Sequence, residues 1–303
     1  MSAPYPKTGP VTLRVNLADS QLATALKAGK VSSPIVNFDF CGPKVASDGF
    51  KAMVREGAFD AGELAVVTYL QCKAYDKPWT ILPACVVGRF QHNTISYMHR
   101  GKDLTPKDLE GQKVVMRSYT QTTPTWARGL LQHQYGVDLS KVTWVAADDA
   151  HLAEYSEPAG VQRVDRKAKP LDQRMIEGEF QFGILGPEAP KHPDARRLIP
   201  DHEAASAAWH KQHGCTHINH MFVVHRELAS TRPDVVAEIY RLLSESKQAA
   251  GLNGKAIDPL PFGVEQVARS IDIVGQYAHE QKITPRRFST DELFDKSMRA
   301  LKG

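Results

Sequence analysis

The chain has 303 residues, of which 42% are hydrophobic and 24% charged, and its formal net charge is +4 at pH 7. This composition is typical of a globular protein and excludes an intrinsically disordered chain. The mild charge fits a small anionic ligand as readily as no charged ligand at all. Because the sequence has no arginine-rich run, the charge is too weak to indicate a nucleic acid partner. A chain of this length exceeds what one hydrophobic core usually supports, so two lobes are expected.

The first ten residues, Met1 to Pro10, contain no positively charged segment followed by an apolar stretch. This predicts a protein without a secretory signal and a cytoplasmic location. No run of about 18 apolar residues is present, so no membrane partner is expected. The cysteines are scattered and predict reduced thiols rather than a disulfide framework. They are Cys41, Cys72, Cys85 and Cys215.

Strand-like and helix-like segments alternate from residue 11 to residue 99. Apolar patterning predicts strands at 11–17, 35–40, 59–64, 80–87 and 94–99, and helices at 21–28, 44–55 and 66–75. Strands that alternate with helices of this length favour an α/β fold with a mainly parallel sheet and helices on both faces.

A second α/β set follows a connector at 104–113. The patterns predict strands at 113–116, 142–146 and 182–185, helices at 124–135, 171–177 and 203–213, and a loop at 157–170. An apolar strand at 220–225 returns the chain to the first lobe, where helices at 232–248, 264–281 and 290–301 pack. The expected domains are residues 1–98 with 221–303 as a discontinuous first lobe, and 99–220 as the second. A ligand is expected in the cleft between them.

The strongest local feature is a hydroxyl-rich turn that leads from the strand at 113–116 into the next helix. Free backbone N–H groups at a helix start, helped by the helix dipole and nearby hydroxyls, suit a carboxylate or a phosphate. The hydroxyls belong to Ser118, Thr120, Thr122 and Thr123. Simple helix capping by serine and threonine is the alternative.

Two more segments offer polar groups to a cleft. Arg89 and His92 would supply a fixed cation and a titratable donor, although on these residues alone an exposed turn between two strands is the favoured explanation. Glu63 ends the third predicted strand on the cleft side and is a candidate ligand contact.

A histidine-rich segment contains His213, His217 and His220. Structural zinc usually takes its ligands from two separate places in the chain, so one catalytic histidine with two bystanders is favoured over a metal site. The chain has no glycine-rich phosphate loop and no GxSxG sequence, which removes support for a nucleotide cofactor and for α/β-hydrolase chemistry.

Several segments resemble 4,5-dihydroxyphthalate decarboxylases, through their order and spacing rather than through any single motif. The segments are Gly57 to Leu64, Phe90 to His92, Tyr119 to Gly129, Leu131 to Val137, His220 with its strand, Pro261 to Glu265, Tyr277 to Gln281, Pro285 to Arg287 and Asp291 to Phe294. The resemblance runs nearly end to end. It implies the two-lobed type II periplasmic-binding-protein fold, which that family shares with transporter solute-binding proteins.

The resemblance also implies a reaction, the non-oxidative removal of one carboxylate from a hydroxylated aromatic acid. The ring is protonated at the carbon that bears the carboxylate, CO₂ leaves, and no organic cofactor is involved. On this hypothesis His92 and His220 are the candidate proton donors, and the partner is a small aromatic carboxylate. The candidate substrate-binding residues are Arg89, Glu63, Ser118, Tyr119, Thr120, Thr122, Thr123, Trp126 and Arg128.

The chain departs from the family pattern at positions expected to face the cleft. Arg117-Ser118 replaces Pro-Glu, Thr120 and Gln91 replace a glutamine and an arginine, and Ala147 to Asp149 replace glycines. A changed substrate, or binding without decarboxylation, is consistent with these departures.

Two other functions belong to the same architecture. The first is a solute-binding protein that delivers a small organic anion to an ABC transporter, which the fold alone favours. The second, a thiamin-pyrimidine synthase, is disfavoured because the cysteine-rich cluster of that group is missing. Assistance by a divalent metal and a homo-oligomeric state are both left open by the sequence.

Overall fold

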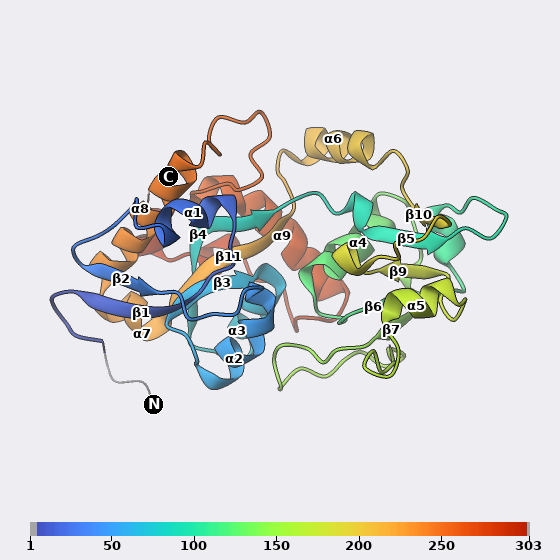
Figure 1. Ribbon diagram of the computed structural model, residues 1–303, viewed down its shortest axis with the longest axis horizontal. Helices are drawn as coiled ribbons and strands as arrows, with labels where there is room; N and C mark the ends of the chain where they lie inside the picture. Colours follow the sequence, from blue (N-terminus) through green and yellow to red (C-terminus); the bar gives the residue numbers. More distant parts are fainter. Residues whose placement is uncertain (1–4, 302–303) are drawn as a thin grey trace.

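The computed structural model describes residues 5–301, which form two α/β lobes lying side by side (Figure 1). Each lobe is built on one sheet. The strand order is β2-β1-β3-β11-β4 in the first lobe and β10-β5-β9-β6-β7-β8 in the second. The predicted two-lobed α/β fold is confirmed. Between residues 5 and 301, no helix is long and apolar enough to cross a membrane.

The first lobe contains elements from both ends of the chain. Its strands are β1 (Val11–Asn16), β2 (Val36–Asp39), β3 (Ala61–Ala65), β4 (Trp79–Gly88) and β11 (Ile218–His225). Its helices are α1 (Gln21–Lys27), α2 (Phe50–Glu56), α3 (Val66–Ala74), α7 (Arg226–Thr231), α8 (Pro233–Ala249), α9 (Val264–Glu280), α10 (Thr290–Leu293) and α11 (Lys296–Arg299), with a 3₁₀ turn η1 (Ala46–Gly49).

The second lobe holds the middle of the chain. Its strands are β5 (Ile95–Met98), β6 (Lys113–Met116), β7 (Thr143–Ala146), β8 (Gln162–Arg163), β9 (Phe182–Ile184) and β10 (Ala195–Arg197). Its helices are α4 (Thr122–His133), α5 (Leu171–Ile176) and α6 (His202–His213), and its 3₁₀ turns are η2 (His92–Thr94), η3 (Pro106–Leu109), η4 (Leu139–Lys141) and η5 (Gly186–Glu188).

The lobe boundaries differ from those expected. Strand β5 pairs with β9 and β10 in the second sheet, and all of β11 pairs with β3 and β4 in the first. By sheet membership the chain therefore changes lobe before Ile95 and again before Ile218. Both positions precede the expected boundaries at 98/99 and 220/221, because each strand pairs along its whole length in one sheet.

Both sheets are mixed, and among residues 5–301 parallel and antiparallel pairs are equal in number in the first sheet, whereas parallel pairs are in the majority in the second. Strand β1 runs parallel to β2 and β3, whereas β11 is antiparallel to β3 and β4. In the second sheet β6 is parallel to β7 and β9, and β7 is parallel to β8, whereas β5 is antiparallel to β9 and β10. The first sheet is less parallel than expected because β11 returns from the other lobe and joins the sheet without a helical crossover, which only parallel neighbours require.

The last predicted helix, at 290–301, is two short helices. Phe294 leaves the helical conformation, and the Asp295 side chain then accepts hydrogen bonds from the N–H groups of Ser297 and Met298, which starts α11. An aspartate at this position favours a new helix start over continuation of the previous helix. The short elements β8, β10 and α7 were not predicted.

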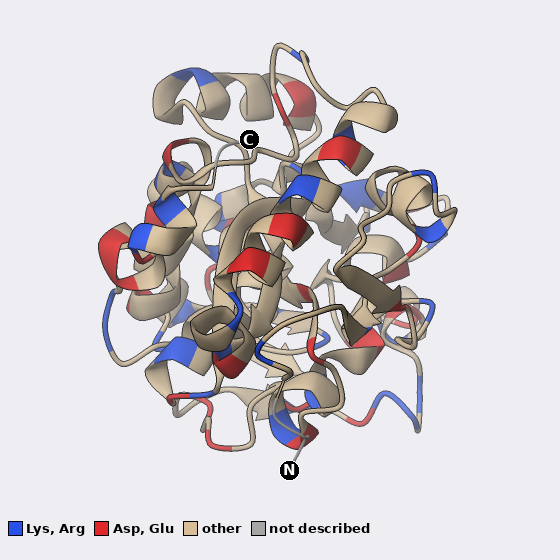
Figure 2. Cartoon of the chain, turned by 90° about the vertical axis from the view of Figure 1, so that its left-hand side faces the viewer, with Lys and Arg blue, Asp and Glu red and all other residues tan. Residues whose placement is uncertain are grey.

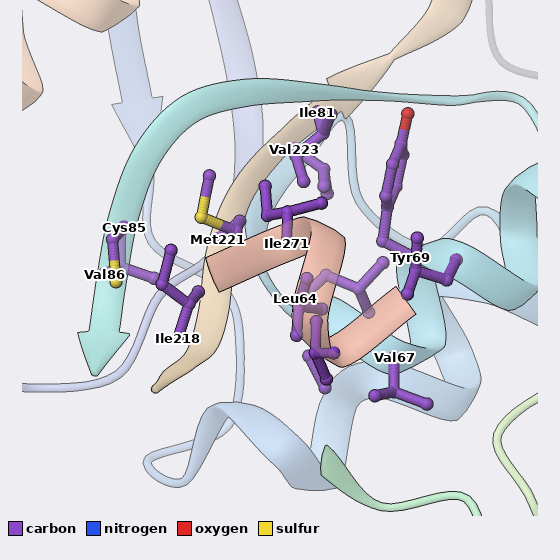
Figure 3. Packing of buried hydrophobic residues seen from close by; sticks show 14 of the residues in the cluster. Leu64, Val67, Tyr69, Ile81, Cys85, Val86, Ile218, Met221, Val223 and Ile271 are labelled. Carbon is purple, nitrogen blue, oxygen red and sulfur yellow. The ribbon is translucent and has the colours of Figure 1, made fainter. Parts of the chain in front are cut away.

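The core of the first lobe lies between its sheet and helices α3 and α9. Leu64 of β3, Met221 and Val223 of β11, and Ile271 of α9 pack against one another there (Figure 3). The same apolar cluster continues through Trp126 into the second lobe. The lobes therefore share a continuous core. On the outer face of the first lobe, acidic and basic residues are interspersed, in keeping with the mild net charge (Figure 2).

Candidate active site between the lobes

A cavity of about 280 Å³ lies between the two lobes. It is placed where β3 leads into α3 and where the chain after β6 leads into α4, so two helix starts face it. Clefts of this kind, at the carboxyl ends of strands, are the usual ligand sites of open α/β folds. The residues that line it and carry the argument below are Phe50, Arg89, Arg117, Gln121, Thr122, Thr123, His151, Asn219 and His220.

His220 and Glu63 form a hydrogen-bonded pair beside this cavity. They lie on the neighbouring antiparallel strands β11 and β3, where His220 is opposite Ala65 and Phe222 is opposite Glu63. This register makes His220 and Glu63 diagonal neighbours on one face of the sheet, within reach of long side chains. His220 Nδ1 lies 2.5 Å from Glu63 Oε1. The pairing of β11 with β4 is irregular at His220, a feature that re-aims side chains near active sites.

Glu63 is almost fully buried, with 4% of its side chain exposed. Burial acts to raise its pKa, but the hydrogen bond and charge of His220, with the Ala18 N–H and the charge of Lys27, outweigh burial and hold the pKa below its usual value. An ionised carboxylate can only accept hydrogen bonds, so His220 donates through Nδ1. The other ring nitrogen, Nε2, has no partner in the described part of the chain, and His220 lines the cavity.

His151, from the irregular segment after β7, is a second histidine in the cavity wall. Its Nδ1 lies 2.7 Å from the hydroxyl of Thr68 on α3. Phe50 packs edge to face against both His151 and His220, at ring-centroid distances of 5.4 Å and 5.2 Å. Burial, followed by the charges of Lys51 and His220, lowers the pKa of His151 to about 3. His151 is therefore neutral near pH 7.

The start of α4, where the sequence predicts an anion site, brings Thr122 and Thr123 to the cavity wall. Pro124 has no N–H, and the N–H groups of Thr122 and Thr123 have no acceptor among residues 5–301, so they are free to face the cavity. The Thr122 hydroxyl accepts from the N–H of Val67 at the start of α3, at 3.3 Å. That of Thr123 accepts from Asn219 of β11, at 3.1 Å. Both bonds join the two lobes at the cavity.

Two arginines reach the cavity, and they differ in their partners. Arg117 is paired with Asp148 at 3.4 Å and with Glu188 at 3.2 Å, so its charge is balanced within the second lobe. Arg89 is exposed, and within the described residues its guanidinium has no carboxylate partner. Within the described residues, Arg89 is therefore a cation of this cavity without an ion-pair partner, and its role in substrate binding stays a prediction.

His92, the other candidate proton donor, lies away from the cavity. It is fully buried on η2, with Nε2 2.9 Å from the Gln134 side chain and Nδ1 3.0 Å from the Ser206 hydroxyl. Its ring stacks on His217. Burial lowers its pKa. Since both ring nitrogens are occupied by protein groups, His92 is placed as a structural residue and not as a donor to a ligand in the cleft.

Arg128 does not face the cavity either. Its guanidinium is fully buried and donates to the Gln281 side chain at 2.7 Å and to the Tyr119 carbonyl at 2.6 Å. It lies over the Tyr119 ring, 3.9 Å from the ring centroid. The expected alternatives, solvent exposure or an ion pair, are also wrong, because the partners of Arg128 are uncharged. Arg128 ties α4 to the end of α9.

Four other predicted substrate-binding residues belong to the same buried framework. The hydroxyls of Ser118 and Thr120 lie 3.4 Å apart inside the turn before α4. Tyr119 donates to the Gln281 carbonyl at 3.1 Å. Trp126 donates to the Ile218 carbonyl at 2.9 Å and is fully buried. None of the four lines the cavity.

The histidines of the metal alternative are not brought together. His213 ends α6 and packs on Trp209, His217 is stacked on Trp126 with a centroid distance of 4.2 Å, and His220 faces the cleft. Across residues 5–301, no group of three histidine, cysteine, aspartate or glutamate side chains is arranged to hold a metal ion. His213, His217 and His220 therefore do not form a metal site in the described part of the chain.

Sequence reasoning missed His151 and Asn219, whereas Arg117 lines the cavity as a position expected to face the cleft. Asn219 could have been found, because it precedes His220 in the strand and is an uncharged polar residue in an otherwise apolar run. It accepts from the Gln91 side chain at 2.6 Å while donating to Thr123. Gln91, a departure from the family pattern, therefore positions the start of α4 through Asn219.

No protein-family model matches the chain. It is 26% identical over 239 residues to a 4,5-dihydroxyphthalate decarboxylase of Comamonas testosteroni, an alignment that covers 73% of this chain and 72% of that protein. The chain is thus similar in sequence to a 4,5-dihydroxyphthalate decarboxylase over most of its length. A second protein of that name, from Pseudomonas putida, is 24% identical over 176 residues, which cover 52% of this chain and 65% of the relative. Both relatives are named as decarboxylases, which are carboxy-lyases.

Solved structures show the same fold at low sequence identity. The periplasmic aliphatic sulphonate-binding protein SsuA of Escherichia coli matches with a TM-score of 0.61 and 11% identity, covering 96% of this chain and 99% of that one. The desulfurization enzyme DSZB matches with a TM-score of 0.57 and 12% identity, covering 95% and 97%. The predicted type II periplasmic-binding-protein fold is thus confirmed. It occurs in both a binding protein and an enzyme, so the fold does not decide the function.

Proposed function

We propose that the chain is a carboxy-lyase that removes one carboxylate from a hydroxylated aromatic acid similar to 4,5-dihydroxyphthalate. The observation that carries this proposal is the His220–Glu63 pair beside a cavity that also presents the start of α4 and the guanidinium of Arg89. The alignment with a decarboxylase over 73% of the chain supports the substrate class.

The cavity offers two kinds of group to a dicarboxylate. The free N–H groups of Thr122 and Thr123, at the positive end of the α4 dipole, suit one carboxylate. The guanidinium of Arg89 suits the other, because its fork of donors matches two carboxylate oxygens. Holding both carboxylates fixes the plane of the ring against the histidines, which is the positioning that a proton transfer to carbon requires.

In the proposed reaction, Nε2–H of His220 gives its proton to the ring carbon that bears the departing carboxylate. A pair of ring π electrons forms the new C–H bond, and the hydroxyl para to that carbon stabilises the resulting charge. The bond to the carboxylate then breaks, CO₂ leaves, and the released electron pair restores the aromatic ring. One proton is consumed for each CO₂ formed, and a solvent proton restores His220.

Glu63 acts through His220. Its carboxylate accepts from Nδ1, so the proton that can be transferred is held on Nε2, and the negative charge offsets the positive charge of the ring when both nitrogens carry protons. The ring of the substrate itself takes up charge during the reaction, so the proposed chemistry needs no organic cofactor.

A second function, the binding of a small organic anion for delivery to a transporter, is favoured by the fold shared with sulphonate-binding proteins. Such a receptor uses an anion site and a cleft, and both are present here. Binding alone does not require a proton donor supported by a buried carboxylate, such as His220 with Glu63. For this reason we prefer the enzyme.

The test is to incubate the purified protein with a panel of hydroxylated phthalates and benzoates, with and without a chelator. CO₂ release and product formation are followed together with thermal-shift binding. We expect CO₂ and 3,4-dihydroxybenzoate from 4,5-dihydroxyphthalate, or the corresponding products from a close analogue. Binding without any CO₂ would favour the receptor, and loss of turnover in chelator would add a metal to the mechanism.

A further inference from the structure

The proposed reaction leaves one titratable group of the cavity without a role. His151 lines the same cavity as His220, and both rings pack edge to face on Phe50. It comes from the segment after β7, in the second lobe, while its anchor Thr68 belongs to α3 of the first. His151 is therefore fixed across the lobe junction, at the place where a bound ring would lie.

The hydrogen bond of His151 to Thr68 occupies one ring nitrogen and leaves the other free. Nδ1 is 2.7 Å from the Thr68 hydroxyl, and Nε2 has no partner within residues 5–301. Thr68 is buried, with 1% of its surface exposed, so the anchor itself is shielded from water. A ring that is anchored through Nδ1 and lines a cavity offers Nε2 to a ligand.

The electrostatic surroundings of His151 select the kind of ligand group. Burial is the largest cause of the lowered pKa of His151, and the nearby Lys51, His220, Arg117 and Arg55 lower it further, so the ring stays neutral. A neutral imidazole has one donor and one acceptor nitrogen, and which one is Nε2 depends on how the Thr68 hydroxyl is turned. A hydroxyl of the ligand can pair with Nε2 in either tautomer of His151, because a hydroxyl both donates and accepts hydrogen bonds. A carboxylate only accepts, so it can pair only with the tautomer that carries the proton on Nε2.

We infer that His151 is the specificity-determining residue that recognises the ring hydroxyl of the substrate through Nε2. This inference rests on the proposed function for the identity of the ring. The hydroxyl in question is the one para to the departing carboxylate, whose electrons stabilise the protonated ring. The surrounding cations favour the partial negative charge that this oxygen carries when it shares its proton with His151.

The experiment is a double-mutant cycle between one protein group and one ligand group. Dissociation constants of phthalate and 4-hydroxyphthalate are measured by calorimetry for the wild type and for His151→Phe. The wild type should bind the hydroxylated compound about 5- to 10-fold more tightly, the value of one net hydrogen bond. In His151→Phe the ratio of the phthalate to the 4-hydroxyphthalate dissociation constant should fall to about 1, because the hydrogen bond to the ring hydroxyl is removed. The binding of phthalate, which has no such hydroxyl, should change by less than about 2-fold.

Two further variants make the result specific. Thr68→Val removes the anchor and keeps the imidazole, and it should lower the ratio part of the way, which also tests the inference if His151→Phe does not fold. His92→Gln, a buried histidine outside the cavity, should keep the wild-type ratio. A wild type that does not distinguish the two ligands, or a ratio that persists in folded His151→Phe, would overturn the inference.

CO₂ release from 4,5-dihydroxyphthalate, measured on the same samples, separates this inference from the proposed function. If the wild type releases CO₂ but the ratio of dissociation constants is unchanged in His151→Phe, the proposed decarboxylase is supported and the role of His151 is excluded. If the wild type releases no CO₂ but the ratio falls to about 1 in His151→Phe, the decarboxylase is excluded and the hydroxyl site is supported. If neither ligand binds the wild type, both proposals fail together.

Discussion

The ring of Tyr277 occupies the space that a side chain on Gly129 would need. A Cβ atom placed on Gly129 would stand 2.0 Å from Cδ2 of that ring. Gly129 belongs to α4 of the second lobe and Tyr277 to α9 of the first, and the Trp126 ring packs edge to face on the same tyrosine at 5.6 Å. The two lobes are thus in direct van der Waals contact behind the cavity.

This contact predicts a large cost for a single methyl group. Gly129→Ala should lower the free energy of unfolding by at least about 1–3 kcal/mol, because α4 and α9 must move apart to admit the new side chain. The control is Gly275→Ala in α9, where a Cβ would meet no atom within 4 Å. It should stabilise the protein by about 0.5–1 kcal/mol through helix propensity. Urea denaturation of the two variants measures both effects, and equal effects would contradict the packing described.

Arg128→Met should affect stability and not binding. The change leaves the Gln281 side chain and the Tyr119 carbonyl buried without their donor, so the free energy of unfolding should fall by about 1–3 kcal/mol. The Michaelis constant for the substrate, and the dissociation constant of phthalate, should stay within about 2-fold of the wild type, since Arg128 does not line the cavity. A stable variant with strongly weakened phthalate binding would return Arg128 to the substrate-binding role expected from the sequence.

Arg89→Gln should weaken the binding of dicarboxylates. Loss of a charge-assisted hydrogen bond from the free guanidinium should raise the dissociation constant of phthalate about 10- to 100-fold and reduce its dependence on salt concentration. The matched control is Arg286→Gln, because Arg286 is paired with Glu292 at 2.7 Å outside the cavity. Calorimetry at two salt concentrations provides the measurement. Equal weakening by both variants would show that general surface charge, and not Arg89, attracts the ligand.

The His220–Glu63 pair should contribute a pH-dependent part of the stability. The pKa of Glu63 is lowered in the folded protein from its ordinary value of 4.5. Its contribution is therefore fully present above that value and is lost as the pH falls through the folded-state pKa. The difference in unfolding free energy between the wild type and Glu63→Gln should accordingly shrink as the pH is lowered from about 6 to about 3. A difference that stays constant over this range would show that Glu63 is not ionised in the pair.

Much of the fold follows from local patterns in the sequence. Ser20 caps α1 by accepting from the Ala23 N–H, and Gly57 ends α2 with a φ of +64°, both as their residue types predict. The direction of β11 could not be predicted in the same way, because an apolar strand pattern is identical for parallel and antiparallel neighbours.

The candidate site was only partly predictable, and α4 shows the physical reason. Nine of its residues are buried, from Thr122 to Leu131, so the helix has no exposed polar stripe from which its rotation could be inferred. The sequence therefore could not tell that Thr123 faces the cavity while Arg128 faces α9. His151 lies in an irregular segment, where no periodic pattern fixes the direction of a side chain.

The most direct test of the central claim compares three histidine variants in one assay. The initial rate of CO₂ release from 4,5-dihydroxyphthalate is measured for the wild type, His220→Asn, His92→Gln and His225→Asn, the last being at the far end of the same strand β11. If His220 donates the proton, only His220→Asn should lose turnover, by about 10²- to 10⁴-fold, while still binding phthalate. Full turnover by a folded His220→Asn protein would contradict the account.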